Sequence, residues 1–171
     1  ELQWRMWQKQ FQALRDGDVA DLAAVYASTP APEGAQASWI WYGALAYLVA
    51  AERRVADGNP GAALEVYRTS IEHFRQSIER EPQYTSSAQH YVALAWSGVA
   101  KVHLDRGDLD AAVEALRQSA AANAGGFRHA DGLGNTPRSV ARALIQLLER
   151  TDRETQAAEL ESSLAAAGVD L

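Results

Sequence analysis

The sequence predicts an all-α protein. Alanine makes up 34 of the 171 residues, and long segments combine it with leucine, glutamate and arginine, which all favour helices. Alternating runs rich in valine, isoleucine or threonine, which would indicate β-strands, do not stand out. The chain has about the length of one domain, enough to bury a continuous core. We therefore expect a single helical domain over residues 1–171.

A first helical hairpin is expected over residues 2–28. Two amphipathic segments, 2–15 and 18–28, are joined by a short turn that contains Gly17 and Asp18. Glycine suits the left-handed residue that ends a helix, and aspartate can cap the next helix. The linker at 29–34 contains two prolines and is expected to end the hairpin.

Three more hairpins are expected along the rest of the chain. The second covers 36–81 and turns at 57–60, and the third covers 83–123 and turns at 105–108, each turn containing a glycine. A glycine-rich loop at 124–137 then leads to a last pair of helices, 137–150 and 152–167. The final helix carries many polar residues, as expected for a solvent-facing end.

Residues 93–124 carry the most informative pattern. Repeats of the form W-x2-L-[GA]-x2-Y, eight residues, then A-x3-F-x2-A-x4-P are typical of tetratricopeptide repeats. This stretch resembles one such repeat, although His103, Ser119 and Ala124 differ in type from the preferred residues. The matching positions are Trp96, Val99, Ala100, His103, Ala112, Leu116, Ser119 and Ala124.

The second hairpin shows part of the same pattern in two phases. Phe74, Ser77 and Pro82 have the spacing of its last part, while Ala63 and Tyr67 show the alanine–aromatic spacing seven residues earlier. The simplest interpretation is two extra turns in each helix of this hairpin.

The resemblance implies an α-solenoid, a right-handed superhelix of antiparallel hairpins with elongated middle hairpins. Such proteins bind other proteins, so we expect an adaptor or scaffold that holds a partner peptide or helix. In this family the first helices of successive hairpins line a concave groove. Only Lys101 resembles the basic set with which some members grip an acidic tail, so an apolar partner is favoured. The corresponding groove residues are Trp41, Tyr42, Leu45, Leu48, Glu52, His90, Tyr91, Leu94 and Lys101.

Three alternatives to the groove stay open. The aromatic residues at helical spacing could be ordinary core of a small solenoid. The chain could be a self-assembling repeat module, a homo-oligomer that buries Trp4, Trp7 and Phe11 against another copy. The long helices could also enclose a pocket for a small molecule or a lipid.

An enzymatic function is not expected, and neither a metal site nor a cofactor is predicted. His129 and Asp131 in the glycine-rich loop are too few to form a metal-ligand set. His73, His90 and His103 lack the spacing of a zinc-binding helix, and the chain has no cysteine.

Charge and hydropathy restrict the partners and the compartment. The net charge is -6 and no basic stripe is present, so a nucleic-acid partner is not expected. The longest apolar stretch, 39–51, is too short to span a membrane. The cytoplasm is slightly favoured. A periplasmic or exported protein stays open, because the sequence begins at Glu1 and not at a methionine, which is compatible with removal of an N-terminal signal or anchor. Arginine far outnumbers lysine, which suggests a bacterial source.

Overall fold

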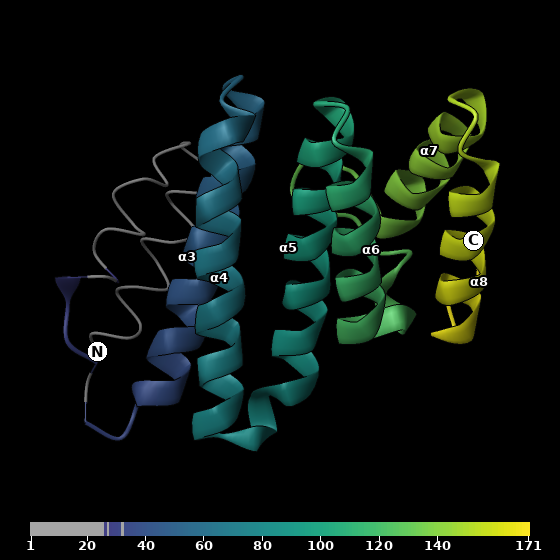
Figure 1. Ribbon diagram of the computed structural model, residues 1–171. Helices are drawn as coiled ribbons and strands as arrows, with labels where there is room; N and C mark the ends of the chain where they lie inside the picture. Colours follow the sequence, from purple (N-terminus) through teal and green to yellow (C-terminus); the bar gives the residue numbers. More distant parts are fainter. Residues whose placement is uncertain (1–25, 27, 32) are drawn as a thin grey trace. The chain divides into compact units, whose positions relative to one another are not determined.

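The computed structural model describes residues 26, 28–31 and 33–171, and every regular element in this part of the chain is helical (Figure 1). The all-α prediction is thus confirmed for these residues. The expected hairpin at 2–28 lies outside the described residues, apart from Tyr26 and Ser28. The helices are α3 (Gln36–Ala56), α4 (Pro60–Arg80), η1 (Pro82–Tyr84), α5 (Thr85–Asp105), α6 (Leu109–Asn123), η2 (Ala124–Gly126), α7 (Pro137–Arg150) and α8 (Glu154–Ala166).

Contacts within the chain divide it into two compact units, residues 1–91 and 92–171, with the boundary inside α5. The expectation was one domain over the whole length. Each unit is built from antiparallel helices.

The helices end where the sequence provides a residue that tolerates a left-handed backbone. Gly58 after α3 and Gly107 after α5 have φ angles of 79° and 75°. The next residues, Asn59 and Asp108, each donate a backbone hydrogen bond to the carbonyl five residues earlier, at 2.8 and 2.9 Å. This is the Schellman arrangement, which satisfies carbonyls at a helix end and reverses the chain direction. The turn between α7 and α8 uses the same geometry with Asp152, whose φ is 58°.

In the first unit, α3 and α4 lie side by side and antiparallel (Figure 1). Their contact relies on small residues, because Ala44, Ala51 and Ala63 are fully buried and alanine lets two helix backbones approach closely. The hydroxyl of Ser70 on α4 donates a hydrogen bond of 2.7 Å to the carbonyl oxygen of Ala44 on α3. This buried bond fixes the axial register of the two helices.

The second unit contains the same arrangement between the later part of α5 and α6. Ala100 and Ala112 are fully buried. The hydroxyl of Ser119 on α6 donates a hydrogen bond of 2.7 Å to the carbonyl oxygen of Ala93 on α5. We call these two serine–carbonyl bonds the serine clamps.

The two clamps belong to an internal repeat of 49 residues that the sequence analysis missed. Residues 42–70 align without a gap to residues 91–119, and 11 of these 29 positions are identical. The alignment also decides between the two phases noted in the second hairpin. Ser70, not Ser77, is the equivalent of Ser119, because Ser77 donates to the carbonyl of Phe74 in its own helix. The two extra turns of α4 therefore follow Ser70.

The second unit departs from the repeat after Ser119. Helix α6 ends at Asn123, and the chain then forms η2 and a turn in which Phe127 is 2% exposed. The carboxylate of Asp131 accepts hydrogen bonds from the backbone N–H groups of Leu133 and Asn135, at 2.9 and 2.8 Å. Thr136 and Ser139 then form a capping box that starts α7. The hydrogen bonds of Asp131 and the capping box at Thr136 therefore order the glycine-rich loop predicted at 124–137.

Helices α7 and α8 close the second unit. One face of α7 is buried through Val140, Ala141, Leu144 and Leu148, as the helical spacing of these residues requires. Most polar residues of α8 are exposed, in agreement with the predicted solvent-facing end.

Candidate partner-binding site

Three helices of the first unit bring aromatic rings together. Trp41 comes from α3, Phe74 from α4 and Tyr91 from the start of α5. The ring centroids of Trp41 lie 5.8 Å from Phe74 and 5.5 Å from Tyr91, both in edge-to-face geometry. The rings of Phe74 and Tyr91 stack at 5.5 Å with an angle of 9°. These are favoured separations for aromatic pairs, each contributing about 0.5–1.5 kcal/mol beyond burial.

Two further rings extend this group. Tyr42 lies edge-on to Trp41 at 5.2 Å, and His90 lies edge-on to Tyr91 at 5.0 Å. Phe74 is completely buried, whereas the other four side chains are only half-buried. The aromatic cluster therefore has a buried floor, Phe74, and a partly exposed rim. Its members are Trp41, Tyr42, Phe74, His90 and Tyr91.

The sequence places this cluster in the turns outside the serine clamps. Trp41 and Tyr91 precede the clamped alanines of α3 and α5 by three and two residues, and Phe74 follows Ser70 by about one helical turn. The cluster thus depends on the elongation of α3, α4 and α5. In the repeat alignment, Asn123 occupies the position of Phe74 and ends α6.

A second set of rings, which is buried, adjoins the cluster. Tyr26 and Trp39 pack at 4.9 Å, with Tyr42 against them. The Tyr26 side chain lies against Gly43, with its Cβ atom 3.4 Å and its nearest ring atoms 3.6 Å from where a Cβ atom of residue 43 would be. Burial, with a smaller contribution from Tyr42, raises the pKa of the Tyr26 hydroxyl well above its usual range. Tyr42 therefore connects the cluster to the core of the first unit.

Three of the other five expected groove residues, Leu48, Glu52 and Leu94, are buried. Leu45 is half-buried, Leu48 is 3% exposed and Glu52 is 6% exposed. Leu94, in the second unit, is 5% exposed. Lys101, also in the second unit, forms an ion pair of 2.6 Å with Asp105 one turn later in α5.

Of the nine expected residues, the structure brings four into contact and adds one that the sequence analysis did not select. The four are Trp41, Tyr42, His90 and Tyr91. Phe74 was noted only for its spacing within the repeat pattern. Phe74 lies one helical turn after the clamp residue Ser70, and this spacing could have identified it as a member of the cluster.

His73, His103 and the loop residue Asp131 contact groups of the chain itself. The Nδ1 atom of His73 lies 2.8 Å from the carbonyl oxygen of Thr69, and that of His103 lies 3.2 Å from a carboxylate oxygen of Asp108. Asp131 organises its own loop, as described above. Among the described residues, no three histidine, cysteine or acidic side chains are grouped so that they could hold a metal ion.

The self-assembly residues Trp4, Trp7 and Phe11 lie outside the described residues. Within residues 26, 28–31 and 33–171, none of the helices has the length and apolar character that crossing a membrane requires.

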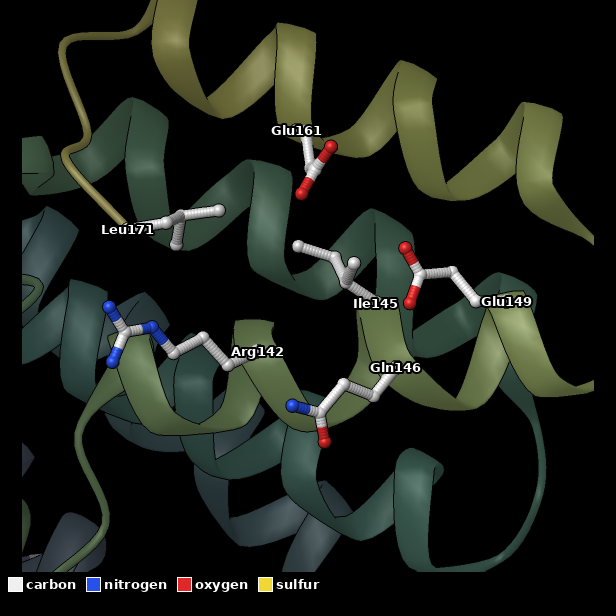
Figure 2. A pocket seen from close by; sticks show the side chains of 6 residues that line it. All are labelled: Arg142, Ile145, Gln146, Glu149, Glu161 and Leu171. Atoms are coloured by element: carbon white, nitrogen blue, oxygen red, sulfur yellow. The ribbon is translucent and has the colours of Figure 1, made fainter.

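The second unit has a shallow open pocket between α7 and α8 (Figure 2). Its volume is about 450 Å³, and its lining is mostly polar. Such a lining does not resemble the apolar cavity expected for a lipid.

Comparisons of the chain with protein-family models, with curated proteins and with solved structures found no match.

Proposed function

We propose that the chain is a tetratricopeptide-like helical-repeat module, an α-solenoid that binds a partner polypeptide as an adaptor or scaffold. The repeat of 49 residues supports this proposal, because two hairpins share the same glycine turn, the same alanine contacts and the same serine clamp. Stacked hairpins of this kind typically act by presenting a binding surface.

The observation that carries the proposal is the partly exposed rim of the aromatic cluster. Tryptophan and tyrosine contribute large contact areas at little entropic cost and often dominate interface energies. Trp41 and Tyr91 are residues of these two types and are partly exposed. The buried ring of Phe74 packs against both of them. The indole N–H of Trp41 is buried without a hydrogen-bond partner among the described residues.

The chemistry of the rim indicates an apolar partner segment. His90 is the only side chain of the cluster that can become charged near neutral pH. A peptide or helix with aliphatic or aromatic anchors would therefore fit better than a charged peptide terminus.

Site-specific photo-crosslinking tests this proposal. A benzophenone amino acid replaces Tyr91 in one variant and Tyr47 in a control, and each variant is irradiated in an extract of the source organism. Tyr47 is also a half-buried tyrosine of the first unit, but its ring packs on His73 at 5.1 Å and on no ring of the cluster. We expect position 91 to capture one defined polypeptide and position 47 not to capture it. Equal capture at both positions, or none at position 91, would contradict the proposal.

A further inference from the structure

The lining of the α7–α8 pocket has a symmetry that points to a second copy of the chain. Four of its residues lie on one face of α7, at the spacing i, i+3, i+4 and i+7: Arg142, Ile145, Gln146 and Glu149. Glu161 on α8 and Leu171 complete it. Arg142 lies at one end of the pocket, Glu149 at the other and Ile145 between them (Figure 2).

These four positions are symmetric about the point midway between Ile145 and Gln146. If another α7 packs antiparallel across that point, Arg142 of each copy faces Glu149 of the other. Gln146 then lies over Ile145, of which only 6% is exposed. An interface of a two-fold dimer must be self-complementary in this way, because each contact occurs twice with the roles of the copies exchanged. A face with an arginine and a glutamate in symmetric positions meets this requirement.

The charges on this face are also available for such contacts. Arg142, Glu149 and Glu161 are exposed, and none of them forms an ion pair within the described part of the chain. By contrast, Arg153 at the start of α8 is bound to Asp110 of α6. The free charges of the second unit thus include an opposite-sign pair, two helical turns apart, on one helix face.

We propose that the α7–α8 pocket is the contact surface of a two-fold symmetric homodimer, in which α7 packs antiparallel on α7 of the second copy. The surface uses none of the residues of the aromatic cluster and none of Trp4, Trp7 and Phe11, and the proposal does not depend on the proposed function. Because the pocket is small and only Ile145 and Leu171 are aliphatic, the dimer is weak and weakens further as salt rises.

Charge reversal tests the antiparallel pairing directly. In the Arg142→Glu variant, two glutamates face each other twice per dimer, and in Glu149→Arg two arginines do so. We expect each variant to weaken dimerisation at least about tenfold in sedimentation equilibrium at raised protein concentration. Arg150→Glu is the matched control, since Arg150 is an exposed arginine of α7 outside the pocket, and should dimerise much like the wild type.

The decisive step is to recombine the variants. An equimolar mixture of Arg142→Glu and Glu149→Arg restores both opposite-charge contacts and should form a heterodimer, and the Arg142→Glu/Glu149→Arg double variant should form a homodimer. Circular dichroism confirms that each variant is folded. A wild type that stays monomeric at the highest concentration would overturn the proposal. So would single variants that dimerise like the wild type, or folded variants whose mixture stays monomeric.

Discussion

Ser119 on α6 donates a buried hydrogen bond of 2.7 Å to the carbonyl oxygen of Ala93 on α5. The same bond, with the same length, joins Ser70 to Ala44 one repeat of 49 residues earlier. A hydroxyl that reaches the backbone of a neighbouring helix requires close packing, which the buried alanines allow. The clamp therefore defines the register of each hairpin. The helical turns outside the clamp differ between the two hairpins, and in the first they contain the aromatic cluster.

The first prediction concerns this clamp. Ser119→Ala removes the hydroxyl and leaves the Ala93 carbonyl with only its own helical bond, so we expect a loss of about 0.5–1.5 kcal/mol in the free energy of unfolding. Ser70→Ala should cause a similar loss. Urea unfolding measures both, with Ser162→Ala on the exposed face of α8 as the control. Clamp variants as stable as this control would show that the bonds contribute nothing to stability.

The second prediction concerns the turn glycines. A Cβ atom at Gly58 meets no atom within 4 Å, but the φ angle of 79° disfavours any side chain there. Gly58→Ala should therefore cost about 1–2 kcal/mol through backbone strain alone. Gly61→Ala is the matched control, because Gly61 also has open space but lies in the first turn of α4, where alanine is preferred. Thermal unfolding should shift in opposite directions for the two variants, and a parallel shift would contradict the turn geometry.

The third prediction concerns the acid sensitivity of the second unit. Hydrogen bonds from Gln156 and Arg153 lower the pKa of Asp110 below its usual value of 3.8. A carboxyl group whose pKa is lower in the folded state stabilises the protein above its unfolded pKa, and this contribution disappears as the pH falls through the folded pKa. Stability from this group should thus be constant from neutral pH to about pH 5 and fall below about pH 4.

Carbon-detected NMR titration of the Asp110 carboxyl group measures this pKa directly. Asp110→Asn removes the titrating group, so its unfolding free energy should depend less steeply on pH in the acid range than that of the wild type. A measured pKa at or above 3.8 would show that the contacts with Arg153 and Gln156 do not persist in solution.

The sequence predicted the helices well because their ends are marked chemically. Helices α3 and α7 have the predicted bounds, since Gly58 follows the first and Pro137 begins the second. The start of α5 differs by two residues because Pro82 opens a short 3-10 turn before the helix continues. Caps and turns are local, and a single sequence contains the information for them.

The aromatic cluster was only partly predictable, because its members lie on three helices. Trp41 and Tyr91 were selected because the resemblance to tetratricopeptide repeats places them on the groove face, but Phe74 depends on the register between α3 and α4. That register follows from the Ser70 clamp, whereas the repeat pattern alone fits this helix in two phases, one of which includes Ser77. The burial of Leu48 and Glu52 likewise depends on neighbours distant in sequence.

The most direct test of the account compares binding and stability for Trp41→Ala/Tyr91→Ala and for Tyr47→Ala. The polypeptide captured by crosslinking is titrated calorimetrically into each protein, and thermal unfolding is measured on the same samples. We predict that the double variant stays folded and loses at least about a hundredfold in affinity, because two aromatic anchors at about 2 kcal/mol or more are removed. Tyr47→Ala should bind like the wild type. A folded double variant with unchanged affinity would contradict it and would assign the cluster to the core of the first unit.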